Sequence, residues 1–136
     1  MAVKQLSVFL ENKKGTLSDL AKVLADAGID LKALTLADTK DYGIARLIPD
    51  DPDRALVVLT QAGQTASVRE VCAFKVPDAP GGLAKVLSVL DQSNINMEYM
   101  YAVLTAPQEK AMMVVRTDDT ATTEKLLKDN GIEIVE

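Results

Sequence analysis

The chain has 136 residues, of which 48% are hydrophobic and 26% charged, as in one ordinary globular domain or two very small ones. It contains no histidine, which excludes a serine–histidine triad, a histidine-bearing zinc site and an imidazole general base. The net charge of −5 and the aromatic content of 4% argue against nucleic-acid binding, which usually needs a basic surface. A single cysteine, Cys72, excludes an internal disulfide and any paired-cysteine metal site.

Nothing in the sequence predicts a membrane span or an export signal. Apolar runs such as 55–59 are short, whereas a spanning helix needs about 20 consecutive apolar residues. The chain passes from Met-Ala-Val-Lys directly into an alternating strand pattern, so no signal peptide is expected. We therefore expect a cytoplasmic protein.

The first half of the chain alternates between strand and helix patterns. Leu6, Val8 and Leu10 alternate with polar or less buried positions, as in a strand with one buried face. Apolar residues then follow the spacing of one helical face, at Leu17, Leu20, Ala21 and Leu24. The remaining elements are expected as strands over 30–37 and 44–48, a helix from Asp50 to Gly63, and a strand over 66–71.

The second half repeats this pattern at a nearly constant offset. An offset of 66 matches Gly15 with Gly81 and Ile29 with Ile95, and it superposes the helical stripe on Leu83, Val86, Leu87 and Leu90. A two-residue slip falls in the turn between the second and third strands, where insertions are tolerated. The expected elements are strands near 72–76, over 96–105, 111–116 and 132–135, a helix over 83–90, and a helix from Asp118 to Gly131.

Each half therefore reads β-α-β-β-α-β. This order is that of the ferredoxin-like fold, an α+β arrangement in which two helices cover one face of an antiparallel sheet. We expect one repeat over residues 1–69 and another over 70–136. The chain near Val68 continues almost directly into the strand near Cys72 without a proline- or glycine-rich linker, which favours rigidly packed units.

The most informative segment is the turn between the first strand and the first helix of each half. It reads Asn-Lys-Lys-Gly-Thr-Leu over 12–17 and Asp-Ala-Pro-Gly-Gly-Leu over 78–83. Glycine at a helix start lets backbone N–H groups approach a guest, and a helix N-terminus attracts a carboxylate or phosphate. Thr16 and Asp19 also predict a variant of the capping box. The same residue types serve in any tight strand-to-helix turn, so a purely structural role stays open.

Both segments resemble the ACT domain. Asn-x-x-Gly-x-Leu, a helix and Gly-Ile-Asp-Leu carry the resemblance in the first half, and Asp-x-Pro-Gly-Gly-Leu followed by Asn-Ile-Asn-Met carries it in the second. It covers about residues 3 to 136 as two copies, a layout similar to free-standing tandem ACT proteins such as the glycine cleavage repressor type. ACT domains are regulatory modules that usually bind amino acids and control metabolic enzymes or transcription. The resemblance thus implies a regulatory protein without a cofactor, and not an enzyme.

The resemblance also implies a set of ligand contacts. Asn12 and Asp78 fall where a side chain meets the polar group of the ligand, and Asn96 falls on an asparagine that opens strand two. Asp30 stands at that position in the first half, and both aspartates depart from the usual asparagine. Family ligands often lie between paired domains, so Asn12 would face Asn96 as the working site and Asp78 would face Asp30. The backbone amides would come from Gly15, Thr16, Leu17, Gly81, Gly82 and Leu83.

Other features of the sequence leave alternatives open. Tyr99 and Tyr101 share one face of a strand and suit either a pocket wall or ordinary packing. The pairs Asp50-Asp51 and Asp118-Asp119 complement helix dipoles and only superficially resemble metal ligands. A small ferredoxin-like hydrolase would need an arginine at its phosphate loop, where the first loop offers only lysines and the second no basic residue.

An interaction scaffold with vestigial sites is a further alternative. We also expect a homodimer or a larger closed assembly, because small sheets tend to cover their edges by pairing.

Overall fold

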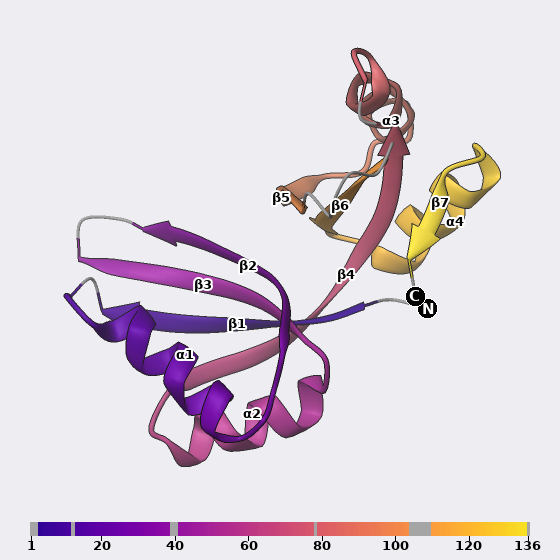
Figure 1. Cartoon of the computed structure of the whole chain (residues 1–136). Coiled ribbons are helices and arrows are strands. Elements are labelled where there is room, and N and C mark those ends of the chain that lie inside the picture. Colours follow the sequence, from indigo (N-terminus) through magenta and orange to yellow (C-terminus); the bar gives the residue numbers. More distant parts are fainter. Residues whose placement is uncertain (1–2, 12, 39–40, 78, 104–109, 136) are drawn as a thin grey trace. The chain divides into compact units, whose positions relative to one another are not determined.

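A computed structural model describes residues 3–11, 13–38, 41–77, 79–103 and 110–135. The chain folds into two compact units, one formed by Lys4–Arg69 and the other chiefly by the residues from Glu70 onward. In each unit helices pack against strands (Figure 1).

The first unit contains a four-stranded arrangement with two helices. Its strands lie in the order β2-β3-β1-β4, and the pairs β1–β3 and β2–β3 are antiparallel. The elements in chain order are β1 (Val3–Glu11), α1 (Thr16–Asp26), β2 (Leu31–Asp38), β3 (Tyr42–Pro49), α2 (Pro52–Gln61) and the first part of β4 (Thr65–Pro77).

The second unit repeats this arrangement. Its first strand is the second part of β4, which pairs antiparallel with β6 on one side and with β7 on the other, while β5 pairs with β6. The further elements are α3 (Gly82–Gln92), β5 (Met97–Val103), β6 (Lys110–Thr117), α4 (Thr120–Asp129) and β7 (Glu133–Val135). The predicted α+β, ferredoxin-like fold class is confirmed.

The starts of the helices follow the repeat pattern of the sequence. Helix α1 begins at Thr16 and α3 at Gly82, an offset of 66 (82 − 16), whereas α2 begins at Pro52 and α4 at Thr120, an offset of 68 (120 − 52). The two strands expected near 66–71 and 72–76 form one continuous strand, β4. No glycine, proline, asparagine or aspartate occurs between Thr65 and Val76, so nothing there favours a turn.

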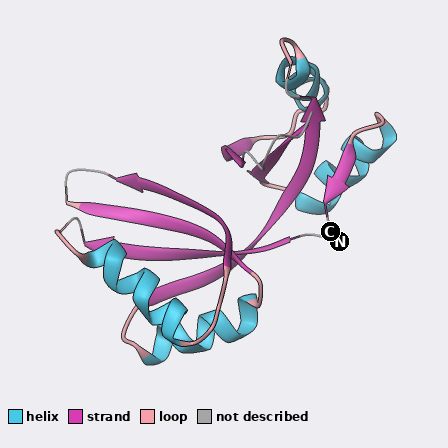
Figure 2. Ribbon diagram, in the orientation of Figure 1, coloured by secondary structure: helices cyan, strands magenta, loops and turns pink. Residues whose placement is uncertain are grey.

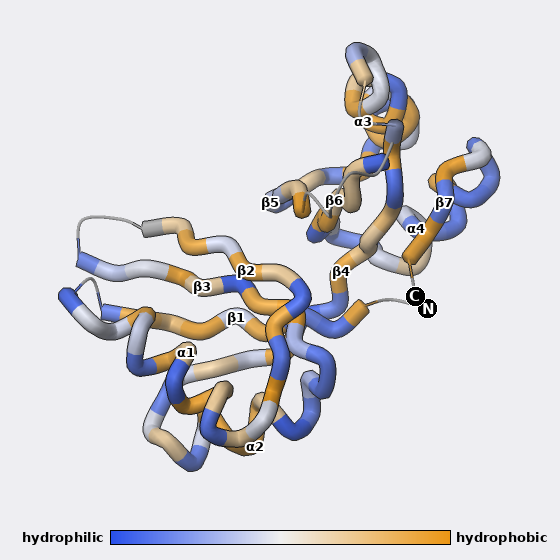
Figure 3. Tube along the Cα trace, viewed as in Figure 1, coloured by the Kyte–Doolittle hydropathy of each residue, from blue (hydrophilic) through white to orange (hydrophobic). Residues whose placement is uncertain are grey.

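Each unit has its own apolar core between the strands and both helices. In the first unit Leu6, Val8 and Leu10 of β1 pack with Leu20 and Leu24 of α1, and residues of α2 complete the cluster. Both helices lie on the same side of the strands in this unit (Figure 2). Apolar and polar positions alternate along α1 and α2 (Figure 3), as expected for helices with one buried face.

The second core is built in the same way, but only two of the four residues of the predicted stripe, Val86 and Leu90, belong to it. Cys72, Phe74 and Val76 of β4 pack with Val86 and Leu90 of α3. Leu83 and Leu87 were also expected on this face, yet Leu83 is 38% exposed and Leu87 lies outside the core cluster. In the first repeat Ala21, which was expected on the buried face of α1, is likewise exposed.

Candidate ligand-binding site

The turn after β1 is held in shape by Gly15 and Thr16. Gly15 has φ 91° and ψ −10°, a left-handed conformation that favours glycine, and it is the N-cap of α1. The Thr16 hydroxyl lies 3.0 Å from the Glu11 carbonyl oxygen and 3.1 Å from that of Lys13, where it donates back toward the strand. These contacts fix the direction in which the first turn of α1 points.

The first turn of α1 has no side-chain cap. The predicted capping box at Thr16 and Asp19 is wrong: Gly15 is the N-cap and makes no side-chain cap hydrogen bond. The Thr16 hydroxyl is turned toward strand carbonyls instead, because Thr16 is already the first helical residue. The intrahelical bonds begin with Asp19 N donating to Gly15 O at 2.9 Å, so the amides of Leu17 and Ser18 precede them.

The second helix of each unit differs, since an aspartate caps it. The Asp51 carboxylate accepts from Arg54 N at 3.2 Å at the start of α2. The Asp119 carboxylate accepts from Thr122 N at 3.0 Å and from the Thr122 hydroxyl at 2.6 Å at the start of α4. The hydroxyl bond, followed by the amide bond, lowers the pKa of Asp119. One aspartate of each acidic pair, Asp51 or Asp119, therefore caps a helix, and the described residues contain no cluster of three or more groups suited to a metal ion.

A small cavity lies beside the uncapped turn of α1. Its volume is about 170 Å³, and we call it the loop cavity. It is lined by Leu10, Glu11, Lys13, Gly15, Thr16, Leu17, Ser18, Leu36 and Gly43. The predicted residues Gly15, Thr16 and Leu17 are thus brought together at one cavity.

The loop cavity combines a cation with helix amides. The Lys13 ammonium lies 2.8 Å from the Glu11 carboxylate, with both side chains exposed. Their hydrogen bond, and secondarily the attraction of opposite charges, lowers the pKa of Glu11 and raises the pKa of Lys13, so both are ionised at neutral pH. A positive side chain next to a helix N-terminus is an arrangement suited to a carboxylate or another small anion.

The turn after β4 has the same backbone but a different lining. Gly81 has φ 88° and ψ −10°, and it caps α3 without a side-chain hydrogen bond. A Cβ atom on Gly82 would collide with the Pro77 carbonyl oxygen, so the chain passes too close to that strand end for a side chain. Gly81 and Gly82 thus start α3 as predicted, while Leu83 exposes its side chain.

Asp30 and Asn96 occupy a different end of their units. Asp50 N donates to Asp30 O at 2.9 Å, and Asp30 N donates to the Asp50 carboxylate at 3.2 Å. Asp118 N likewise donates to Asn96 O at 3.2 Å. Within the first unit Asp30 is separated from the loop by the length of α1, about 16 Å for an 11-residue helix. Asp30 and the loop of its own unit therefore do not form one site.

Two predicted residues cannot be compared, because Asn12 and Asp78 lie outside the described residues. Leu36 and Gly43 belong to the loop cavity but were missed from the sequence. They come from β2 and β3, and the register of these strands brings them near the loop. In this register Leu36 lies opposite Ala45, and Asp38 lies opposite Gly43.

The family is shown by comparison with known proteins. A family model described as ACT domain pair matches residues 1–136. The chain belongs to the ACT domain pair family. A crystal structure of a protein from Bacteroides thetaiotaomicron matches with a TM-score of 0.93 at 36% sequence identity, over 99% of this chain and 92% of that one.

Two further structures share the fold of the ACT pair. The regulatory subunit of aspartate kinase from Thermus thermophilus matches with a TM-score of 0.68 at 14% identity, over 95% of this chain and 93% of that one. The corresponding subunit from Thermus flavus has a TM-score of 0.67 at 16% identity, over 95% and 92%. At these identities the likeness shows the fold alone.

The two ACT repeats differ in chemistry at equivalent positions. Lys13 and Thr16 of the first loop correspond to Ala79 and Gly82 of the second at the offset of 66. The first loop therefore has a cation and a hydroxyl that the second lacks.

The remaining features singled out from the sequence can be located in the structure of the ACT pair. Cys72 is buried in the second core, and burial raises the pKa of its thiol to about 12, so it is a neutral packing residue at physiological pH. Tyr99 and Tyr101 lie half-buried on β5, opposite Arg116 and Val114. Among the helices in the described ranges, none is both long enough and apolar enough to cross a membrane.

Proposed function

We propose that this ACT pair is a non-catalytic regulatory protein that binds an amino acid at the loops between strand one and helix one. Binding would modulate a metabolic enzyme or transcription, with the protein acting as a homodimer or a larger closed assembly. The ligand can shift the equilibrium between two states of the protein only if it binds these states with different affinity.

One observation carries this proposal: the uncapped first turn of α1 and the Lys13 ammonium line the same cavity. An amino acid brings a carboxylate that suits both groups. The first loop is the stronger candidate, because the second has Ala79 and Pro80 in place of the two lysines. Membership of the ACT pair family and the fold shared with regulatory subunits of aspartate kinase support a regulatory role.

The test is a thermal-shift screen of the twenty amino acids against the wild type and two glycine variants. A ligand that binds only the folded protein stabilises it by about 2.7 kcal/mol at 100 times its Kd. Gly15→Ala and Gly28→Ala form a matched pair, because both glycines have positive φ (91° and 71°) and open space around the added Cβ. Of these two glycines, Gly15 lines the loop cavity and Gly28 does not.

Both variants should therefore lose similar stability, while only Gly15→Ala should lose the ligand-induced shift. Lys13→Met should weaken binding of the same amino acid, whereas Lys14→Met, which changes the net charge equally, should not. No shift with any amino acid, or equal shifts in Gly15→Ala and Gly28→Ala, would exclude the first loop as the site.

A further inference from the structure

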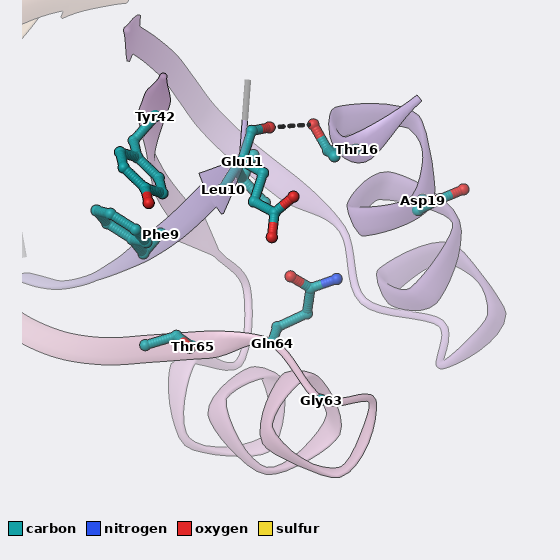
Figure 4. A pocket seen from close by; sticks show the side chains of 9 residues that line it. All are labelled: Phe9, Leu10, Glu11, Thr16, Asp19, Tyr42, Gly63, Gln64 and Thr65. Atoms are coloured by element: carbon teal, nitrogen blue, oxygen red, sulfur yellow. Dashed lines mark hydrogen bonds between the residues drawn. The ribbon is translucent and has the colours of Figure 1, made fainter. Parts of the chain in front are cut away.

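A second, larger cavity adjoins the loop cavity in the first repeat. It has a volume of about 320 Å³, room for about ten non-hydrogen atoms at the roughly 30 Å³ that a water molecule occupies. It lies between the end of β1, the first turn of α1 and the turn from α2 to β4 (Figure 4). Its lining, which defines what we call the aromatic cavity, is Phe9, Leu10, Glu11, Thr16, Asp19, Tyr42, Gly63, Gln64 and Thr65.

An aromatic pair forms one wall of this cavity. The rings of Phe9 and Tyr42 have centroids 4.9 Å apart with their planes inclined by 32°. Both side chains are large, and their residues are 48% and 49% exposed. Exposed aromatic faces beside a cavity offer a surface for an alkyl chain and attract cations through the ring quadrupole.

Acceptor groups stand next to these rings. The Glu11 carboxylate and the Gln64 amide are turned toward one another across the cavity (Figure 4). Within the part of the chain that the structure describes, the Gln64 side chain makes no hydrogen bond. Asp19 also belongs to the lining, with its carboxylate turned away from the Glu11 and Gln64 side chains (Figure 4), and no described lining residue is basic. The electrostatic character of the cavity is therefore that of a cation-binding site.

We propose that the aromatic cavity binds a small primary amine. The ammonium would lie between the Glu11 carboxylate and the Gln64 amide oxygen, and the alkyl chain would lie along Phe9 and Tyr42. Charge-assisted hydrogen bonds of this kind are about twice as strong as neutral ones. The ligand needs no carboxylate, because no described residue that lines this cavity is basic, whereas Lys13 lines the loop cavity.

The two cavities are coupled through Glu11. Its carboxylate is already paired with Lys13, a residue of the loop cavity, so a bound ammonium competes with Lys13 for Glu11. A displaced Lys13 is then available to an anion in the loop cavity. An amine and an amino acid should therefore raise each other's affinity by the same factor, as linkage requires. This coupling rests on the proposed function, whereas the amine site itself does not.

Calorimetric titration with butylamine and putrescine tests the site, with butanol and butyrate as the neutral and anionic controls. The amines should bind the wild type and the controls should not, and affinity should fall with added salt. Glu11→Gln should weaken amine binding by about tenfold, the effect of losing a hydrogen bond to a charged group. Asp26→Asn removes the same charge from the exposed end of α1 and should leave amine affinity unchanged.

A second set of variants separates this proposal from the amino-acid site. Lys13→Met should tighten amine binding, because it removes the competing cation, while the same change weakens amino-acid binding. Lys14→Met should do neither, and Gly15→Ala should retain the amines. Absence of amine binding, or equal losses in Glu11→Gln and Asp26→Asn, would overturn the amine site. Amine binding without any amino-acid binding would instead overturn the proposed function alone.

Discussion

Gly82→Ala is the substitution whose effect the structure defines most closely. The added Cβ would collide with the Pro77 carbonyl oxygen, which belongs to the backbone at the end of β4 and cannot rotate away. Forcing extra atoms into a packed position costs about 1–3 kcal/mol. Alanine also lowers the conformational entropy of the unfolded chain, which stabilises the folded protein by about 0.4–1 kcal/mol. At the midpoints of these ranges, the net loss expected from the two effects is about 1.3 kcal/mol.

The equivalent position in the first repeat provides the control. Thr16 already carries a Cβ, so Thr16→Ala creates the same residue without a new collision and should lose only about 1 kcal/mol, from its two hydroxyl hydrogen bonds. Urea and thermal unfolding followed by circular dichroism measure both variants, with calorimetry to establish whether the transition is two-state. A free energy of unfolding for Gly82→Ala within about 0.5 kcal/mol of the wild type, the usual range for neutral surface changes, would refute the steric argument.

Three further predictions concern other positions. Cys72 should react slowly with a thiol reagent at pH 8 and fast in denaturant, because the thiol is buried in the fold. Its pKa in the fold is about 12, above the ordinary 9.0, so its contribution to the free energy of unfolding is complete below about pH 9 and is lost as pH rises toward 12. Asp51→Ala should cost about 1 kcal/mol in urea unfolding through loss of the α2 cap, and an unchanged midpoint would contradict the cap. Thr16→Val should cost about 1 kcal/mol and weaken amino-acid binding together, because the hydroxyl orders the loop; loss of neither would show that these bonds are dispensable.

The periodicity of the sequence was enough to predict the fold, since Leu6, Val8 and Leu10 have a single buried face and their counterparts recur in the second core. The glycine turns were also readable, because Gly15 and Gly81 need a conformation that other residues rarely adopt. The capping of α1 could not be predicted from the sequence, because the Thr16 hydroxyl can bond either to amides of the helix or to carbonyls of the preceding strand. The position of the Glu11 carbonyl determines which bond forms.

The aromatic cavity was equally hidden from the sequence. Gln64 is far from Glu11 along the chain, and neither residue belongs to a recognisable motif. Glu11 and Gln64 line the same cavity because the end of α2 lies beside the end of β1, an arrangement that the fold topology sets.

The different treatment of helix ends has a consequence for hydrogen exchange. In the free protein, the amides of Leu17 and Ser18 precede the first intrahelical hydrogen bond of α1 and have no side-chain cap, so they should exchange quickly with solvent deuterium. The amide of Arg54, bonded to the Asp51 carboxylate, should exchange more slowly at the start of α2. A carboxylate seated on α1 would slow Leu17 and Ser18 while leaving Arg54 unchanged. Hydrogen exchange at Leu17 and Ser18 would therefore report whether the loop cavity holds a ligand, and exchange at Arg54 in the same repeat would serve as the internal reference.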